Sequence, residues 1–544
     1  MPMLPDRVDY LVVGAGATGM AFCDALLHHF ESDPDRYSAS TTTKTTTTPG
    51  PSVLLIDEHA RPGGQWLDSY DFVRLHQPSE MYGVESTRLE RYADDDDGED
   101  EERHRATRAE ILDYYDGVCG MLESKFDFQF VGETSMIDLD ALDDDDDDDD
   151  DAHFATTAAA NDGEEDADRH RRYGLSDGRS ILARKVVDAR YLRPDLPSRV
   201  PPRFRFDPSS VRCLPVNALA GRRAADDDDD DDDVAMGARH YVVIGAGKTG
   251  MDAIAHLVRD RGVDPNDVVW IAPNEAWITA RENIGSCMEF LHECTSLLKR
   301  DHSDEEGARD VLRSTDFFQN GFLEWEKQGK VYRFDEDIVP TKFKDATLCK
   351  GELDVLRRVT RVVRKGRIES IDDRGTMHFN DGTSMPLPWS SADTLFVHCS
   401  AGAFNYSERT KKPPPVFSRH RISIQDVYGT PGFCFVGSII GKLEGLGTKL
   451  TDAEKNSMCS APSPDAAQAM LPLGPSGGDI GVLSKDHGYV QRLSNLRKWL
   501  QVPEIRSWLV GHRLFNLGHF TAEDMDTLVE ETWNVLEEYD VVSH

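Results

Sequence analysis

Two segments of the chain, far apart in the sequence, repeat one pattern of an apolar strand, a glycine turn and a helix. The first begins at Asp9 and reads DYLVVGAGATGMAFCDALL, and the second begins at His240 and reads HYVVIGAGKTGMDAIAHLV. After each turn the apolar residues recur at helical spacing, which predicts a helix directly after the strand. A strand, a G-x-G-x-x-G turn and a helix form the phosphate-binding unit of a dinucleotide-binding fold. The repeat therefore predicts an α/β protein with two Rossmann-like, three-layer dinucleotide-binding domains.

In the first turn, each glycine has a separate physical task. Gly14 permits the tight turn, Gly16 lets the backbone approach a pyrophosphate, and Gly19 allows the helix to pack on the strand. The next strand ends at Asp57, the usual place for a carboxylate that binds a ribose hydroxyl. The spacing to this aspartate exceeds the usual ~20 residues, and a threonine-rich insertion at residues 38–51 accounts for the excess.

The second turn places Gly245, Gly247 and Gly250 in the same three tasks, with Lys248 and Thr249 between the last two glycines. This turn predicts a second dinucleotide site.

The strand after the second turn, residues 268–272, ends without a carboxylate. A missing acid favours NADP over NAD, whose ribose 2′-hydroxyl needs an acceptor. Lys248 and Arg281 are candidates to offer positive charge to a 2′-phosphate, whereas Glu275 lies close enough in sequence to reverse the argument. The sequence therefore favours NADPH and leaves NADH as the alternative.

The segment after Asp57 reads RPGGQW and contains Gly63, Gly64, Gln65 and Trp66. An acidic residue followed at this spacing by two glycines and an aromatic residue resembles the FAD domain of two-dinucleotide flavoproteins, particularly the class B flavin monooxygenases. The resemblance implies that the first site binds FAD and that this segment leads from the adenosine towards the flavin ring.

By the same resemblance, the following residues FVRLHQPS lie near the isoalloxazine, with Arg74 and His76 as polar candidates. The alternative is structural, with Arg74 paired to a carboxylate and His76 buried in the core.

Two glycines in the last third of the chain extend the resemblance. The stretch PGFCFVGSIIG, which starts at Pro431, resembles the last FAD-domain strand, with Gly437 beside the flavin, and Gly402 matches the small-residue turn after a returning strand. Disulfide reductases often have Gly-Asp where this chain has Gly437-Ser438, which favours the monooxygenase branch. One element is missing, because residues 187–217 lack the phenylalanine, glycine, histidine and aromatic fingerprint of class B monooxygenases.

The resemblance implies that the NAD(P) domain is inserted in the FAD domain. We expect the first part of the FAD-binding domain at residues 1–215, the NAD(P)-binding domain at 216–390, the returning FAD segment at 391–460 and a helical C-terminal region at 461–544. Within the last region, Thr521 and Asp524 resemble a capping box that starts an amphipathic helix.

The composition excludes several classes of protein. Of the formal net charge of −38, 21 charges belong to aspartate runs at residues 94–97, 143–151 and 226–233, which we interpret as solvated insertions. The acidic balance argues against a nucleic-acid partner. The nine cysteines include no C-x-x-C pair, so a dithiol reductase and a zinc site are not expected. No signal peptide or membrane span is indicated, and we expect a cytoplasmic protein.

These expectations together favour one function and leave two alternatives. The resemblance implies hydride transfer from NADPH to FAD, then reaction with molecular oxygen to a flavin hydroperoxide that oxygenates a small organic substrate. The alternatives are an NAD(P)H-dependent flavin reductase or dehydrogenase without oxygen insertion, and a flavin-binding sensor with little turnover. The sequence assigns no catalytic acid or base, no metal and no oligomeric state.

Overall fold

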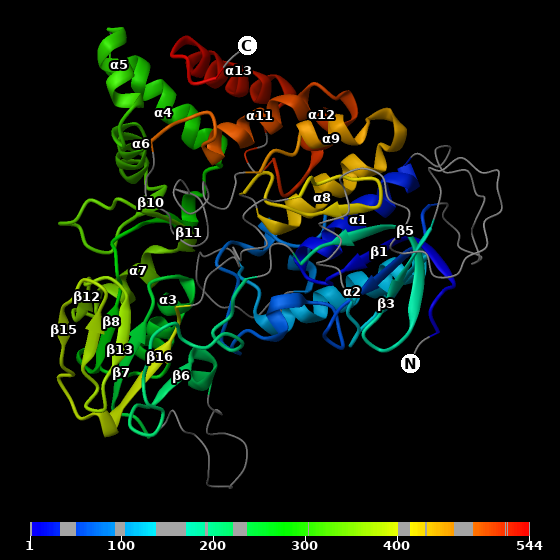
Figure 1. Ribbon diagram of the computed structural model, residues 1–544. Helices are drawn as coiled ribbons and strands as arrows, with labels where there is room; N and C mark the ends of the chain where they lie inside the picture. Colours follow the sequence, from blue (N-terminus) through cyan, green and yellow to red (C-terminus); the bar gives the residue numbers. More distant parts are fainter. Residues whose placement is uncertain are drawn as a thin grey trace.

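The structure is a computed structural model that describes residues 3–32, 50–92, 104–137, 170–190, 194–220, 237–302, 304–400, 414–429, 432–461, 482–516, 518 and 520–542. The three aspartate runs and most of the threonine-rich stretch lie outside these residues. Figure 1 shows two lobes, each built around a sheet, with the C-terminal helices across the top.

The first lobe contains a six-stranded sheet in the order β17-β5-β1-β2-β3, with β4 paired to β5 at one side. All pairs are parallel except β4 with β5. Apart from the β4 hairpin and a later return at β17, this is the order of a dinucleotide-binding sheet. Its strands are β1 (Arg7–Val13), β2 (Val53–Ile56), β3 (Phe128–Val131), β4 (Arg171–Gly174), β5 (Ser180–Asp188) and β17 (Arg421–Ser423).

The second lobe contains a five-stranded parallel sheet in the order β12-β8-β7-β16-β6. An antiparallel meander, β13-β14-β15, lies beside it. The strands are β6 (Cys213–Pro215), β7 (His240–Ile244), β8 (Val268–Ile271), β12 (Val362–Val363), β13 (Ile368–Ile371), β14 (Met377–Phe379), β15 (Ser384–Met385) and β16 (Thr394–His398). The chain leaves the first sheet after β5 and returns to it at β17, which confirms the inserted second domain.

The second domain is larger than residues 216–390. Strands β6 and β16 both belong to its sheet, although the predicted boundaries place them in the first domain. The return to the first sheet therefore begins after β16 and not at residue 391.

Helices cover the two sheets and the space between the lobes. A small sheet, β10 (Val331–Tyr332), β9 (Trp277–Ala280) and β11 (Phe343–Leu348), lies above the second sheet in Figure 1. The helices up to this point are α1 (Ala17–Ser32), α2 (Arg108–Lys125), α3 (Lys248–Ala255), α4 (Cys287–Asp301), α5 (Glu305–Leu312), α6 (Asp316–Lys327) and α7 (Lys350–Arg357). The helices labelled α4, α5 and α6 lie above this small sheet.

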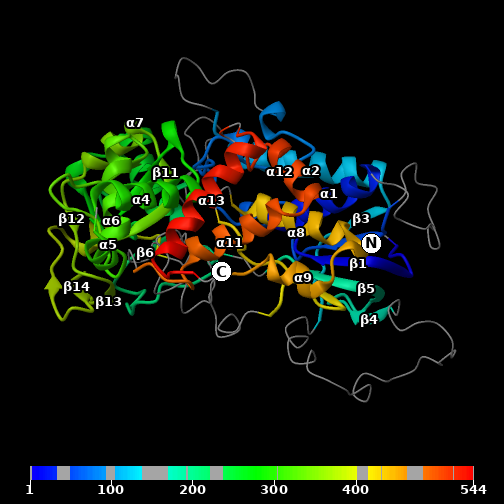
Figure 2. The same ribbon diagram turned by 90° about the horizontal axis from the view of Figure 1, so that it is seen from above.

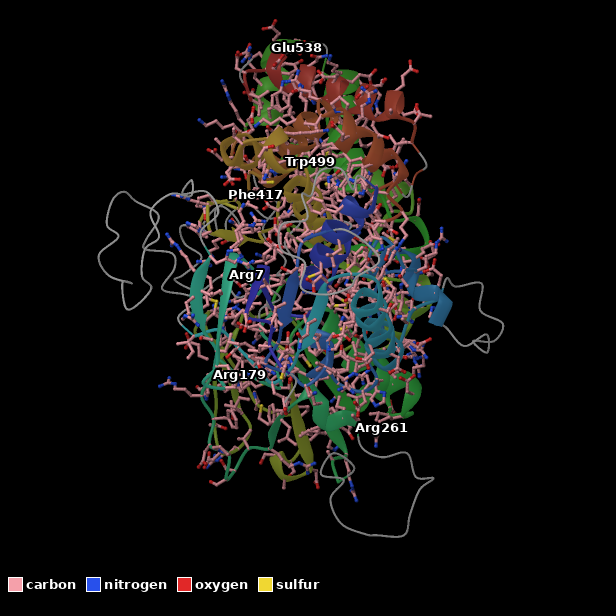
Figure 3. The ribbon with its side chains drawn as sticks, turned by 90° about the vertical axis from the view of Figure 1, so that its right-hand side faces the viewer. Arg7, Arg179, Arg261, Phe417, Trp499 and Glu538 are labelled. Carbon is pink, nitrogen blue, oxygen red and sulfur yellow. The ribbon has the colours of Figure 1, made fainter. Side chains whose placement is uncertain are left out.

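The C-terminal region contains α8 (Phe433–Gly445), α9 (Asp452–Ser457), α11 (Gly488–Leu500), α12 (Pro503–Gly511) and α13 (Ala522–Glu538). Helix α13 begins with the predicted capping box of Thr521 and Asp524. It packs on α4 of the second lobe (Figure 2). Trp508 of α12 stacks on Phe435 of α8, which packs on α1 of the first lobe. Trp499 of α11 is buried, and Figure 3 shows Glu538 of α13 at the upper end of the molecule. Through the contacts of α12 and α13, the C-terminal helices join both lobes.

The stretch after Pro431 forms a helix, so the predicted FAD-domain strand is wrong. Gly437, Gly441 and Gly445 recur every four residues and place one glycine face of α8 against α1. A methyl group at Gly437 would lie 2.3 Å from the Thr18 carbonyl oxygen, and one at Gly441 would lie 2.7 Å from that of Phe22. A short apolar run fits a strand or a buried helix equally well, and the glycine spacing decides for the helix.

Candidate functional site

The two glycine turns have nearly the same geometry. Gly14 and Gly245 both have positive φ angles, +109° and +128°. The Gly14 amide donates to the Ile56 carbonyl at 2.9 Å, and the Gly245 amide donates to that of Ile271 at 3.1 Å. Each turn is therefore anchored to the end of the neighbouring strand in its own sheet.

The third glycine of each turn has no space for a side chain. A methyl group at Gly19 would lie 2.0 Å from the Gly14 carbonyl oxygen, and one at Gly250 would lie 2.1 Å from that of Gly245. The predicted packing task of these two glycines is confirmed.

The middle glycines differ. A methyl group at Gly247 would meet nothing within 4 Å, so open space lies in front of the second turn. At the first turn, a methyl group at Gly64 would lie 2.7 Å from the Gly16 α-carbon, and the Gly63 amide donates to the Ala15 carbonyl at 2.9 Å. The RPGGQW segment thus lies directly on the first turn, and Gly64 has no room there for a side chain.

Asp57 lies at the first turn, as its position after β2 predicts. Its carboxylate accepts the Ala15 amide at 2.6 Å, the His59 amide at 2.9 Å and the His59 ring at 2.7 Å. In this structure the aspartate holds the glycine turn in place, and its role towards a ribose stays a prediction.

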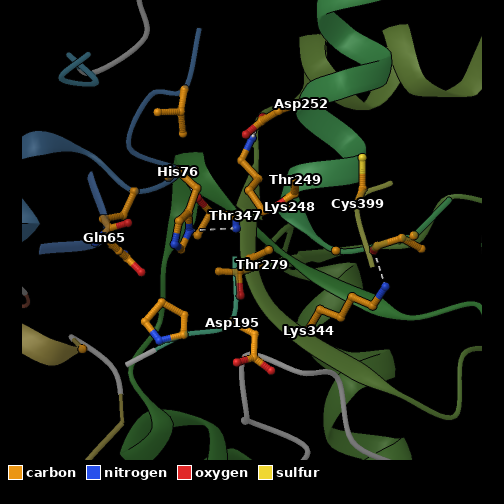
Figure 4. Close-up of a pocket in the computed structure, with 18 of the residues that line it drawn as sticks. Gln65, His76, Asp195, Lys248, Thr249, Asp252, Thr279, Lys344, Thr347 and Cys399 are labelled. Atoms are coloured by element: carbon orange, nitrogen blue, oxygen red, sulfur yellow. Dashed lines mark hydrogen bonds and ion pairs between the residues drawn. The ribbon is translucent and has the colours of Figure 1, made fainter. Parts of the chain in front are cut away.

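A cavity of about 580 Å³ lies between the two lobes. The first lobe contributes parts of residues 65–82, the second contributes residues 244–249, and the interdomain segment 194–204 adds a third wall. Figure 4 shows Gln65 and His76 on one side, and Lys248 and Thr249 on the other. The second glycine turn therefore opens into the cavity, whereas Gly14, Gly16 and Gly19 are not among the residues that line it.

Aromatic rings form the part of the wall contributed by α4, α6, β11 and α11. The Phe290 ring lies 4.4 Å from Phe322 and 4.7 Å from Trp325, and Phe343 lies 5.0 Å from Phe322. Tyr489 lies 5.5 Å from Phe290. Cys287 and Phe290 of α4 therefore line the cavity.

His76 lies in the cavity wall with a defined hydrogen-bonding state. The Thr347 amide donates to its Nδ1 at 3.3 Å, so the proton of the neutral ring is on Nε2. Burial lowers the His76 pKa to about 3, and the positive charges of Lys248 and Arg281 act in the same direction. His76 is therefore a neutral side chain with one N–H donor at neutral pH. Arg74 also lines the cavity, with its guanidinium exposed and donating to the Arg105 carbonyl.

The two cations proposed for a 2′-phosphate have other partners. Lys248 lies 2.5 Å from the Asp252 carboxylate and 3.6 Å from that of Glu352. Arg281 is buried, forms an ion pair with Glu352 at 2.5 Å and is not among the cavity-lining residues. The assignment of Arg281 to a 2′-phosphate is therefore wrong.

Glu275 does not supply the missing ribose acceptor. Its buried carboxylate accepts the Phe334 amide at 2.7 Å and forms an ion pair with Arg364 at 2.7 Å. Three other cations line the cavity on the second-lobe side, Lys342, Lys344 and Arg367. Lys344 donates to the Ala246 carbonyl of the glycine turn, and burial lowers its pKa to about 8.

The two predicted site residues in the last third of the chain have different outcomes. Gly402 lies outside the described residues. Gly437 packs on α1, while its neighbours Phe433, Cys434 and Val436 line the cavity.

Three cavity or junction residues were missed from the sequence. Asp252 could have been found, because it follows Lys248 by four residues and shares a helix face with it. Glu352 and Lys344 come from segments without a motif, and only the folded chain brings them to the glycine turn. The described residues contain no group of three or more His, Cys, Asp or Glu side chains placed to bind a metal, and no described helix is long and apolar enough to cross a bilayer.

Three known proteins are similar to this chain over most of its length. One is an uncharacterized protein of Mycobacterium bovis, and two are uncharacterized proteins of Mycobacterium tuberculosis strains. Each is 30% identical over 511 residues, which cover 93% of this chain and 77% of the relative. No protein-family model matches the chain.

Solved structures match more distantly. A flavin monooxygenase mutant from Stenotrophomonas maltophilia is 14% identical with a TM-score of 0.41, and the match covers 84% of this chain and 100% of that one. An open cyclohexanone monooxygenase is 14% identical with a TM-score of 0.44, covering 88% and 96%. An oxidized steroid monooxygenase bound to NADP is 15% identical with a TM-score of 0.43, covering 98% and 99%. The fold assignment rests on the strand order described above.

Proposed function

This chain belongs to the same family as the three mycobacterial proteins, and we propose that it is an FAD- and NADPH-dependent oxidoreductase that oxygenates a small organic substrate. One observation carries the proposal. The second glycine turn opens into a cavity whose opposite wall, residues 65–82, continues directly from the segment that lies on the first glycine turn. The two nucleotide units thus contribute to one cavity from opposite sides, the second by its glycine turn and the first by the segment that continues from its turn.

The first turn fits the pyrophosphate of FAD. Helix α1 starts there, Gly16 and Ala17 are half-buried, and the N-terminal amides of a 16-residue helix favour a phosphate. Asp57 retains acceptor capacity for a ribose hydroxyl besides its three present donors. Gln65 and Trp66 would then lead the group into the cavity.

The second turn fits the pyrophosphate of NADPH, because the space in front of Gly247 is open. Lys344 already lies against this turn, and Lys342 supplies a second positive charge on the same side of the cavity. When bound, the two groups supply hydride transfer and the reduction of oxygen. The chain itself would bind and orient them, and the aromatic wall would keep water from the reacting atoms.

His76 would orient a carbonyl oxygen in the cavity. Its Nε2–H is the donor, since Nδ1 accepts from Thr347. Because the ring stays neutral well below neutral pH, we assign it hydrogen bonding and not proton exchange.

A second candidate function, a reductase or dehydrogenase without oxygen insertion, is favoured by one feature of the cavity. Residues 194–204 line it without the histidine of the monooxygenase fingerprint.

One experiment tests both functions. The purified protein is reconstituted with FAD, its flavin absorbance is measured, and it is mixed with NADPH first without oxygen and then with oxygen. Bound FAD, rapid flavin reduction and equal consumption of NADPH and oxygen without free peroxide in the presence of a substrate support the monooxygenase. Flavin reduction followed by release of one peroxide for each NADPH, whichever substrate is present, supports the second candidate. A protein that binds no FAD contradicts both candidates.

A further inference from the structure

Glu352, a buried carboxylate in the first turn of α7, forms ion pairs with basic side chains from both lobes. Its side chain is 6% exposed, and it completes a capping box with Cys349 that fixes its position. Arg105 of the first lobe lies 3.1 Å from one carboxylate oxygen, and Arg281 of the second lobe lies 2.5 Å from the other. Lys248, the first residue of α3, lies 3.6 Å away. One carboxylate thus connects the first lobe to the residue that follows Gly247.

A second connection reaches the same lysine. Asp252 lies 2.5 Å from the Lys248 ammonium through one oxygen, and its other oxygen accepts the Tyr70 hydroxyl of the first lobe at 2.7 Å. Lys248 is therefore held between two carboxylates, each of which has a partner in the opposite lobe. Figure 4 shows Lys248 and Asp252 beside the cavity.

The third connection reaches the opposite wall of the cavity. Arg281 donates from Nε to the His76 carbonyl at 2.7 Å, and Thr347 donates to the same carbonyl. The wall at His76 and the glycine turn at Lys248 are thus both attached to Glu352, one through Arg281 and the other directly. Moving either wall relative to the other would separate at least one charged pair in a buried place, which is unfavourable.

We propose that Glu352, with Arg105 as its first-lobe partner, is a positioning group that fixes the second glycine turn relative to the cavity wall at His76. This inference rests on the proposed function, in which the two walls carry the two cofactors. Hydride transfer requires its donor and acceptor at close approach, so a small displacement lowers the rate much more than the affinity. The three cations hold the Glu352 pKa well below its ordinary value, so the positioning does not depend on pH in the neutral range.

The test uses Arg105→Gln, because its side chain is 14% exposed and its loss leaves Arg281 paired with Glu352. Tyr70→Phe removes the hydroxyl that reaches Asp252 and serves as the second variant. The matched control is Arg333→Gln, which breaks an ion pair of 2.7 Å with Glu326 within the second lobe. For each protein, FAD content, the Kd for NADPH, the limiting rate of anaerobic flavin reduction and amide hydrogen exchange of residues 73–77 and 245–252 are measured.

We expect Arg105→Gln to lower the limiting rate at least tenfold, with less than a twofold change in Kd and unchanged FAD content. Exchange in both segments should rise at least threefold, and the control should leave rate and exchange as in the wild type. Equal rates or equal exchange for wild type and Arg105→Gln would overturn the positioning role. If the wild-type protein is not reduced by NADPH, the proposed function fails, and the exchange measurement alone then decides whether Glu352 connects the lobes.

Discussion

Acid should loosen the C-terminal helices through His487. This ring is fully buried at the start of α11, where its Nδ1 accepts the Tyr489 amide at 3.3 Å. It stacks on Phe318 at 4.6 Å and on Tyr489, which lines the cavity. Protonation would remove the acceptor and place a charge among these rings. Burial, with Arg492 nearby, accordingly lowers the His487 pKa to about 3.

The loss of stability in acid follows from the difference between the His487 pKa values of the folded and unfolded states. The unfolded pKa is about 6.5, and each unit of difference corresponds to about 1.36 kcal/mol. Because the folded pKa is lowered, the stabilisation is complete above pH 6.5 and is lost as the pH falls towards 3. At pH 5 His487 binds a proton in the unfolded chain but not in the folded chain. His487 alone should therefore lower the free energy of unfolding at pH 5 by about 2 kcal/mol relative to neutral pH.

The assay compares urea unfolding at pH 7.5 and pH 5 for the wild type and for His487→Asn. Asparagine can accept the same amide as a helix cap but does not titrate. The wild type should lose about 2 kcal/mol more than the variant between the two pH values. His378→Asn, a side chain 42% exposed, is the control and should behave as the wild type. Equal losses for wild type and His487→Asn would refute the argument.

Three further predictions concern the nucleotide sites and the insertions. Gly250→Ala should destabilise the second lobe by roughly 1–3 kcal/mol or more, because the added methyl group overlaps the Gly245 carbonyl. Gly247→Ala should leave thermal unfolding unchanged and raise the Kd for NADPH at least tenfold, because the space in front of Gly247 is open. Similar thermal unfolding of the two variants would contradict this difference. We expect Lys342, a cation of the cavity wall, to contact the 2′-phosphate of NADPH. Lys342→Met should therefore weaken NADPH binding at least fivefold in titration calorimetry and leave NADH binding unchanged, and an equal loss for both nucleotides would contradict this role. Deleting residues 143–151 should leave FAD content and NADPH oxidation nearly unchanged, since dense like charges gain nothing from packing, and a large loss of either would assign this run a site or an interface.

The sequence predicted those features whose cause is local. Gly14 and Gly245 need positive φ angles, and Gly19 and Gly250 must lie against their own turns, so a pattern of a few residues was sufficient. The Thr521 cap has the same local character.

The features that sequence analysis missed depend on contacts between distant segments. Arg281 looked available for a phosphate because its partner Glu352 is far along the chain. The apolar run at Gly437 fits two kinds of structure, and only its glycine face against α1 selects the helix. The boundary at residue 391 was wrong because β16 pairs with β7, which its own residues do not reveal.

The glycine face of α8 limits how this protein can be engineered. Helix α1 starts at the first glycine turn, and α8 starts with cavity residues Phe433 and Cys434, so the two helices share one rigid contact. A larger residue at Gly441 would shift both ends together, because the Phe22 carbonyl leaves no room for it. Libraries meant to reshape the cavity should therefore vary the aromatic positions of α4 and α6 and keep the α8 face fixed.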